Sequence, residues 1–432
     1  MPGSHKSLLA KVKLVLAIGC FGLFSTSVSA QCSSQVPSGN YALAVQVALQ
    51  CGHASSNTAQ GLFDYLGTTG LSSINNLYTG NEVVDIYAHF NAVPLHLWYQ
   101  SSPAIPVAGT RLVLFAIPGV LPANIHWDGP TRANTEQQFV QYLKSTLLSQ
   151  ILSYQASNSP TSPITGVGGL LPNAVASDFN QNFMDSATNI AAPMSMSAAA
   201  STNGSTPNLI GVALQYGSFS ALDSRTKVTS IPLSYTIRND IDPRRQLTFS
   251  VPLTQVDVDG AKAYIAGFGV SYRVPMNDNW TLTPSGKVSG VGSTDLATVS
   301  GMYTGSLTST YIWDMDTYNV AMGNMLSYNR TAKIQSGEYS SNPGITSTVV
   351  RNGLMLSQPA NWNGQKLSVE YSLVDTRYTG GTKLYIDNTQ EIGITVGTNK
   401  NAFSARSFLR GGLTYLRGKD TKGFTANIGY WF

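Results

Sequence analysis

Histidine is the side chain used most often as a general acid or base near neutral pH, and this chain distributes it unevenly. The 432 residues contain five histidines. They are His5, His53, His89, His96 and His126. Most of the chain lies beyond the last of them, so a Ser–His or Asp–His arrangement for acyl or peptide hydrolysis is confined to the first third of the sequence. The second half cannot carry hydrolysis of this kind.

The histidines in the first third do not form a recognisable site. His89 and His96 are seven residues apart, a spacing that matches no common metal-ligand pattern. His89 shares a predicted strand face with Asp85 and Asn91, which suits a solvated surface as well as a site. The glycines of 166–169 are too closely spaced for a phosphate-binding loop, and no Lys-Ser/Thr follows them. We therefore assign no catalytic, cofactor-binding or metal-binding residue, and expect neither a cofactor nor catalytic activity.

Residues 1–30 are typical of a cleaved signal peptide. A basic segment with three lysines precedes a short apolar run, Leu14–Phe24, and small residues end at Ala30. Cleavage would leave Gln31 as the first mature residue. The apolar run is too short to span a bilayer, and Ala17-Ile18-Gly19-Cys20 is a poor lipoprotein signal. A membrane anchor and a lipoprotein are therefore the weaker readings.

The composition of the mature chain excludes some classes of protein. Removal of the three lysines takes the formal net charge from +4 to +1, which gives no electrostatic argument for nucleic acid. Charged residues make up 11% of the chain, against roughly 25% in soluble proteins. No mature segment approaches the roughly 18 consecutive apolar residues of a spanning helix. This balance favours a barrel that hides apolar residues at every second position.

Only Cys32 and Cys51 remain in the mature chain, and both lie near its start. In an exported protein such a pair favours a disulfide over two free thiols. Without supporting histidines, two cysteines this far apart make a weak metal site.

From residue 209 onward the chain alternates between apolar and small or polar residues in twelve stretches. Asn-, Asp- and Gly-containing turns separate them, as at Asp259-Gly260. The stretches lie near 209–221, 227–238, 245–257, 261–275, 280–292, 298–313, 317–332, 346–358, 365–378, 384–397, 406–418 and 422–432. Period two with aromatics toward the strand ends predicts an all-β, 12-stranded antiparallel transmembrane β-barrel at 208–432. A soluble β-sandwich or propeller also alternates and is the alternative.

One face of these predicted strands carries the charged residues. Arg273, for example, alternates with the outward set Tyr272 and Val274. A charge is costly toward lipid and acceptable in a watery lumen, so we expect these side chains to point inward. The predicted lumen charges are Arg238, Arg273, Lys287, Arg351, Glu370, Glu391 and Arg410.

The last strand ends the chain on an aromatic residue. Its apolar face consists of Phe424, Ala426, Ile428, Tyr430 and Phe432, and its other face is small or polar apart from Trp431. This segment resembles the C-terminal assembly signal of bacterial outer-membrane barrels, with Phe424, Ile428, Tyr430 and Phe432 as the signal residues.

Twelve strands after a separate N-terminal region resemble the translocator barrel of autotransporters, and most closely the solitary autotransporter-type barrels that lack a large passenger. The runs 284–296 and 323–328 carry this resemblance. It implies the Gram-negative outer membrane, reached through the cleaved signal peptide. It further implies contact with outer-membrane lipid and lipopolysaccharide, the barrel assembly machinery and periplasmic chaperones, and no nucleic acid. The long repetitive passenger is missing, so the resemblance implies an architecture more than an activity.

Residues 31–158 predict a small mixed α/β domain. Residues 41–50 suit a helix or a strand, 83–99 a strand with a break, and 111–117 a buried strand. Apolar residues at three- and four-residue steps predict a helix over 135–154. Residues 159–207 are rich in small residues and predict a low-complexity linker that is long enough to thread the barrel.

Two classes of function remain. The first is an outer-membrane barrel that anchors or displays the small domain. The alternative is a pore for small solutes, with anions as one candidate. A hydrolase in the N-terminal domain is a distant third.

Overall fold

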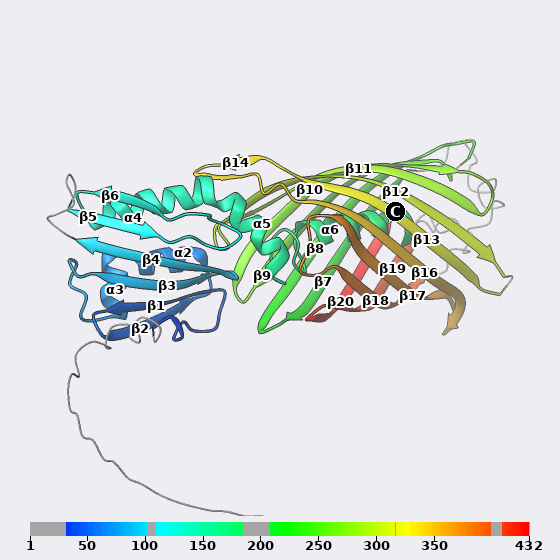
Figure 1. The fold of residues 1–432 in the computed structure, drawn as a ribbon. Helices are drawn as coiled ribbons and strands as arrows, with labels where there is room; N and C mark the ends of the chain where they lie inside the picture. Colours follow the sequence, from blue (N-terminus) through cyan, green and yellow to red (C-terminus); the bar gives the residue numbers. More distant parts are fainter. Residues whose placement is uncertain are drawn as a thin grey trace, which may run out of the picture.

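The structure is a computed structural model, and it describes residues 32–101, 109–184, 208–242, 244–315, 317–398 and 408–431. Two bodies lie side by side, a small α/β domain and a long barrel (Figure 1). Ala30, Gln31 and Phe432 lie outside the described residues, and so do residues 185–207 of the predicted linker.

The small domain is a six-stranded antiparallel sheet with helices on one face. The strand order is β2-β1-β3-β4-β5-β6. The strands are β1 (Tyr41–Val47), β2 (Gln50–Ser56), β3 (Val84–Phe90), β4 (Val93–Ser101), β5 (Thr110–Leu114) and β6 (Ile125–Gly129). The helices are α2 (Ala59–Leu66), α3 (Thr68–Ile74), α4 (Arg132–Tyr142), the π-helical turn η1 (Leu143–Leu147) and α5 (Leu148–Asn158).

The predicted elements of this domain appear with altered boundaries. The segment 41–50 is a strand that turns at Ala48 (φ 51°) into β2. The break predicted in 83–99 falls at Asn91 and Ala92, which both have positive φ, while Pro94 sits inside β4. The helix predicted over 135–154 extends from residue 132 to 158 as α4, η1 and α5, because Thr131 caps its first turn.

The barrel confirms the predicted fold class and the number of strands. Twelve antiparallel strands close on themselves through the pairing of β20 with β7. They are β7 (Leu209–Ala221), β8 (Ser224–Arg238), β9 (Gln246–Val258), β10 (Ala261–Pro275), β11 (Trp280–Ser293), β12 (Thr298–Asp314), β13 (Asn319–Ala332), β16 (Thr346–Trp362), β17 (Gln365–Gly381), β18 (Asn388–Thr398), β19 (Phe408–Gly418) and β20 (Thr421–Trp431). A hairpin of β14 (Ile334–Ser336) and β15 (Tyr339–Ser341) joins β13 to β16.

The interpretation of 159–184 as linker is wrong. Residues 159–169 form a buried turn, and they are followed by helix α6 (Leu170–Phe179) and the π-helical turn η2 (Asn180–Met184). The small residues serve close packing here. Gly168 has φ +75°, and a Cβ on it would lie 2.6 Å from Val228 of the barrel wall. Ser162 accepts a hydrogen bond from the Thr165 amide, so the turn satisfies its own polar groups.

Candidate functional site

The two ends of the barrel differ. Strand β7 begins and β20 ends at the same end, where Gly211 pairs with Trp431; we call this the terminal end. The small domain covers the opposite end, which we call the domain end (Figure 1). There the Ala59 amide donates to the Asp295 carbonyl oxygen at 2.6 Å, and Tyr385 donates through its amide to the Ala156 carbonyl oxygen at 2.8 Å.

The β14–β15 hairpin fastens the helices of the small domain to this end. Lys144 Nζ of η1 lies 3.0 Å from Glu338 Oε2 and 5.3 Å from the centre of the Tyr339 ring. Ser149 Oγ accepts a hydrogen bond from the Asn342 amide at 2.9 Å. The hairpin, which is not part of the closed sheet of the barrel, therefore holds the helices of the small domain against the barrel.

The inside of the barrel changes character along its axis. Toward the domain end many of the inward side chains are apolar and buried, among them Phe219, Val228, Val256, Ile265 and Val349, with buried hydroxyls such as those of Thr226 and Thr421 between them. They join one continuous hydrophobic cluster with the turn 159–169 and the core of the small domain. Toward the terminal end the inward side chains are mainly Ser, Thr, Gln and Arg. An apolar layer thus separates the polar part of the lumen from the domain end.

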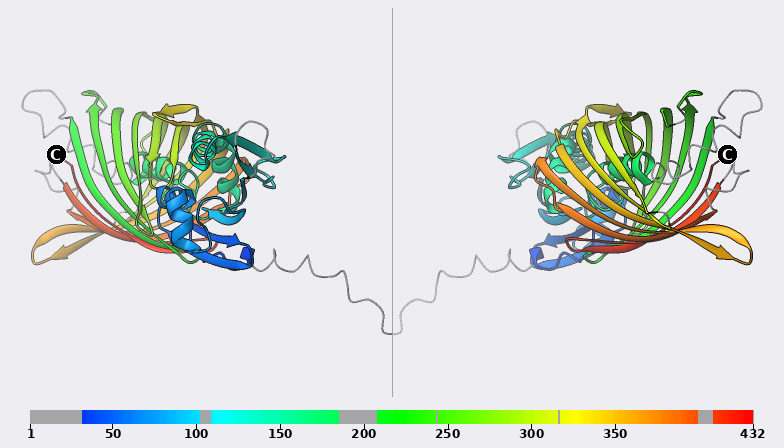
Figure 2. Two further views of the ribbon diagram at one scale, coloured as in Figure 1. Left: turned by 90° about the vertical axis from the view of Figure 1, so that its left-hand side faces the viewer. Right: turned by 90° about the vertical axis from the view of Figure 1, so that its right-hand side faces the viewer.

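Helix α6 lies in this lumen against β11, β12 and β13 (Figure 1). Figure 2 shows the strands curving around it. Two glycines of the wall make room for its aromatics: a Cβ on Gly323 would lie 2.4 Å from the Phe183 ring, and one on Gly353 would lie 2.7 Å from the Phe179 ring. We call α6 and η2 together the plug.

A buried ion pair fixes the plug to the wall. Asp178 of α6 is 3% exposed, and its Oδ1 lies 3.2 Å from Lys287 Nζ of β11. Ser285 and Ser306 both donate hydrogen bonds to Asp178 Oδ2 at 2.7 Å. Lys287 also donates a hydrogen bond to Ser177 Oγ at 3.1 Å, so it contacts α6 at two successive residues.

The structure places all seven predicted lumen charges on the inward face. Two further pairs lie in the wall: Arg351 is 3.0 Å from Glu391, and Arg410 donates a hydrogen bond to Glu370. Arg351 Nη1 also donates to Thr376 Oγ1 at 2.8 Å. The alternation of residues in the sequence identified the seven charges of the wall. It did not identify Asp178 of the plug, which is the partner of Lys287.

The remaining charges lie near the terminal end. Arg273 donates to Gln246 Oε1 at 3.0 Å, and Arg238 stands opposite Gln246 at the last position of β8. Lys287, Arg351 and Arg410 each face a carboxylate.

Beside the plug the lumen holds a cavity of about 290 Å³. Its plug side is lined by Asn173, Asn180 and Gln181, and its wall side by a mixture of apolar, hydroxyl and amide side chains together with the charged residues Lys287, Arg351, Glu391 and Arg410. The apolar residues Val167, Phe219, Val228, Ile386 and Leu416 also line it, from positions toward the domain end. The cavity therefore has a lining of mixed polarity, with the ion-paired charges of the wall on one side and the plug on the other.

The outer face of the barrel carries large apolar side chains in contact with the surroundings. Leu214, Phe268, Leu373 and Leu413 are each about half exposed, at 49, 52, 53 and 58%. An exposed apolar surface that encircles a closed barrel is the surface a bilayer covers. Of the predicted assembly-signal residues, Phe424, Ile428 and Tyr430 lie on this face and are exposed.

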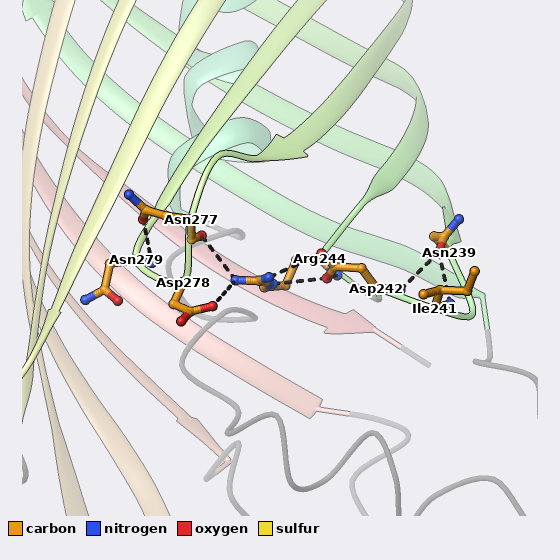
Figure 3. A network of polar contacts seen from close by, with 7 residues as sticks. All are labelled: Asn239, Ile241, Asp242, Arg244, Asn277, Asp278 and Asn279. Atoms are coloured by element: carbon orange, nitrogen blue, oxygen red, sulfur yellow. Dashed lines mark hydrogen bonds and ion pairs between the residues drawn. The ribbon is translucent and has the colours of Figure 1, made fainter.

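Beyond this encircling apolar surface, which we call the belt, a polar network connects two turns at the terminal end (Figure 3). Arg244 donates to both carboxylate oxygens of Asp242, at 3.0 and 3.2 Å, and reaches the Asn277 carbonyl oxygen at 3.1 Å. Burial alone would raise the pKa of Asp242, but the hydrogen bonds from Arg244 outweigh it and hold the pKa below its usual value. The network joins the turns before β9 and β11, where the strands leave the belt.

In the small domain, the four histidines lie on the sheet face opposite the helices. His96 Nε2 lies within hydrogen-bond distance of Asp85 Oδ1, at 3.0 Å, and its ring stacks between those of Tyr87 (4.4 Å) and Phe115 (4.1 Å). His53 and His89 occupy the same face on β2 and β3, and His126 occupies it on β6. Within the described ranges no three His, Cys, Asp or Glu side chains gather closely enough to hold a metal ion.

The predicted disulfide between Cys32 and Cys51 is confirmed. It ties the segment before β1 to the edge strand β2. No helix in the described part of the chain is long and apolar enough to cross a membrane.

The closed sheet, the lipid-facing belt and the filled lumen define a transmembrane β-barrel whose interior is occupied by its own chain. Solved structures of the same barrel class are similar to this chain. The β domain of the Bordetella autotransporter BrkA has a TM-score of 0.41 at 12% identity, covering 52% of this chain and 99% of that one. The translocator domain of NalP from Neisseria meningitidis has a TM-score of 0.39 at 8% identity, covering 60% and 97%.

An outer-membrane channel from Pseudomonas putida F1 has a TM-score of 0.36 at 14% identity, covering 53% of this chain and 97% of that one. No family model matches the chain, and no curated protein matches it. Because these TM-scores are below 0.5, the barrel assignment rests on the strand topology of the chain itself.

Proposed function

We propose that this protein is an autotransporter-type outer-membrane barrel that anchors its small domain and displays it on the cell surface, without catalytic activity. The course of the chain carries the proposal. The small domain covers the domain end, α6 descends inside the lumen, and β7 begins at the terminal end. Such a path connects a domain on one side of a membrane to a barrel whose first strand begins, and whose last strand ends, on the other side.

The orientation follows from the way an exported chain meets the membrane. An even number of strands puts the start of the first strand and the end of the last strand on the same side of the membrane. A chain delivered to the periplasm would keep the two chain termini of the barrel there, while the strand hairpins and the small domain cross the membrane. The terminal end is then periplasmic, and the domain end with the small domain is outside.

Two epitope insertions test this topology. One is placed after Gln31, beside the small domain, and the other after Ile241, which is 95% exposed in a turn at the terminal end. Antibody added to intact cells is expected to bind the first epitope alone, and to bind both once the outer membrane is permeabilised. Binding of the second epitope alone on intact cells would reverse the orientation.

The alternative, a pore for small solutes, is disfavoured by the apolar layer and by the paired lumen charges. Purified protein in a planar bilayer is therefore expected to show no steady single-channel current. A stable, reproducible conductance of the intact chain would restore the pore as the function.

A further inference from the structure

Two asparagines stand side by side on the outer face of the barrel. Asn324 of β13 is directly opposite Asn352 of β16 in the strand register, and we call the two the asparagine pair. Both side chains point outward, because the residue next to each in sequence, Gly323 or Arg351, is buried on the lumen side. Asn324 is half-buried and Asn352 is exposed.

The asparagine pair interrupts the apolar belt. Along β13, Asn324 falls between the outward residues Met322 and Leu326, which are 36% and 56% exposed. Along β16, the next outward residue toward the terminal end is Leu354, which is 46% exposed. On strands farther around the wall, large apolar side chains point outward in the belt: Leu214, Phe268, Leu373, Ile394, Leu413 and Ile428.

Aromatic side chains bracket the level of the pair. Tyr328 lies four residues from Asn324 toward the domain end, and Tyr311 stands opposite Met322 on the side of the terminal end. With a rise of about 3.3 Å per residue and a strand tilt of about 40°, Asn324 lies about 10 Å deeper in the belt than Tyr328. Since aromatic side chains mark the membrane interfaces, the pair lies at the depth of the acyl chains.

Carboxamides at this depth need partners that lipid does not supply. Two carboxamides carry four N–H donors and two acceptor oxygens, more than they can satisfy between themselves. In the part of the chain that the structure describes, neither side chain takes part in a hydrogen bond.

The polar neighbours in the same row of the sheet are already engaged. Ser309, opposite Asn324, accepts a hydrogen bond from the indole N–H of Trp280 at 2.9 Å. Asp375, opposite Asn352, accepts one from Arg377 at 2.8 Å and one from Gln390 at 3.3 Å. The asparagine pair therefore differs from its neighbours in having polar groups left over.

Two glycines flatten the wall beside the pair. Gly286 of β11 and Gly305 of β12 stand opposite each other, and a Cβ on either would meet no atom within 4 Å. Small residues let two membrane-embedded surfaces approach closely. On the inner side of the wall, the plug packs against β11, β12 and β13, so this part of the barrel is supported from within.

We propose that the asparagine pair and the two glycines form the centre of a dimer interface inside the membrane, with a second copy of this chain as the partner. A carboxamide both donates and accepts hydrogen bonds, so the pair is its own complement across a two-fold axis. Asn324 of one copy then meets Asn352 of the other, and the hydrogen bonds that lipid leaves unmade are formed between the copies. The dimer does not depend on the anchoring and display role.

Energy transfer between donor- and acceptor-labelled copies of the full-length protein in liposomes measures the dimer fraction, at a series of protein-to-lipid ratios. The pair variant is Asn324→Leu with Asn352→Leu. A second variant, Gly305→Leu, fills the flat area. Its matched control is Gly411→Leu on the outward face of β19, where a Cβ would have only the Asn427 carbonyl oxygen within 4 Å, at 3.6 Å.

The wild type should dimerise, and the pair variant should do so on the order of a hundredfold more weakly. A side-chain hydrogen bond between membrane segments is worth about 5- to 30-fold in association, and a two-fold interface loses two of them. Gly305→Leu should also weaken the dimer, whereas Gly411→Leu should stay within a few-fold of wild type. Heat-modifiable gel migration verifies that all variants are folded.

A cysteine cross-link locates the interface. Leu326→Cys, beside the pair, should join two copies after oxidation in liposomes. Leu214→Cys on β7 lies on the opposite side of the ring of twelve strands and is similarly exposed, at 49% against 56%, and it should not.

Energy transfer of the wild type at the chance level at every ratio would show a monomer and overturn the proposal. Equal association of the wild type and the pair variant, or cross-linking at residue 214 in preference to residue 326, would place the contact on another face and overturn it as well. None of these outcomes changes the epitope result, which does not depend on association between copies.

Discussion

Removal of the charge at Asp178 is expected to loosen the plug without unfolding the barrel. Asp178→Asn keeps the shape of the side chain but leaves Lys287, whose side chain is fully buried, without its carboxylate. Breaking a buried pair in this way costs about 3–5 kcal/mol. Since about 1.4 kcal/mol corresponds to a factor of ten, the open population of the plug should rise by two to three and a half orders of magnitude.

Hydrogen exchange read by mass spectrometry measures this population directly. Peptides covering 170–184 should lose protection by that factor in Asp178→Asn, while barrel peptides from β11 and β12 keep theirs. The double variant Asp178→Asn with Lys287→Met removes both charges and should recover most of the protection, because a neutral pair has no buried charge to compensate.

A control separates the ion pair from general damage to α6. Asn180 lines the cavity, and Asn180→Ala should change protection by less than about tenfold. If Asp178→Asn behaves like this control, or if the double variant is as unprotected as the single one, the ion pair does not hold the plug and the reasoning fails.

Three further perturbations have defined outcomes. Gly323→Ala brings a Cβ to 2.4 Å from Phe183 and should destabilise the plug by about 1–3 kcal/mol, whereas Gly305→Ala, with no atom within 4 Å, should be neutral; thermal gel-shift curves of the two compare them. Cys51→Ser opens the disulfide of sequence separation 19 and should cost the small domain about 3 kcal/mol in denaturant titration, with full retention of stability as the contrary result. The side-chain hydrogen bond from Thr79, together with backbone hydrogen bonds and against the opposing effect of burial, lowers the pKa of Glu82 to about 2, so its stabilisation is complete above pH 4.5 and lost as the pH falls toward 2. Glu82→Gln should therefore lower the melting temperature of the small domain at pH 7 but not at pH 2, and an equal loss at both pH values would contradict the assignment.

The barrel was predictable because every strand obeys one local rule. A residue that faces lipid and a residue that faces the lumen alternate without exception over stretches such as Phe268 to Arg273, and the alternation needs no knowledge of the partner strands. The same rule found Lys287 and Glu370, whose charges are tolerated only on the inner side. It could not reveal that both are paired, because ion pairing depends on which strand or helix lies opposite.

The plug carries a sequence signal that composition masked. Its buried positions recur in adjacent pairs four residues apart: Leu170 and Leu171, Ala174 and Val175, Asp178 and Phe179, and Asn182 and Phe183. This is one face of a helix. The Pro-, Gly- and Ala-rich stretches on either side favour a linker and hide the pattern.

The central claim is that the plug, residues 170–184, lies inside the barrel, and a cysteine cross-link tests it most directly. Phe183→Cys is combined with Gly323→Cys, because the Phe183 ring touches the inner face of the wall at that glycine. The matched pair is Phe183→Cys with Gly305→Cys, on the outer face of β12. After oxidation in isolated outer membranes, mass spectrometry of the proteolytic peptides should find the thiol at 183 joined to the one at 323 and not to the one at 305. Absence of the first cross-link in folded protein, or formation of the second, would contradict the account.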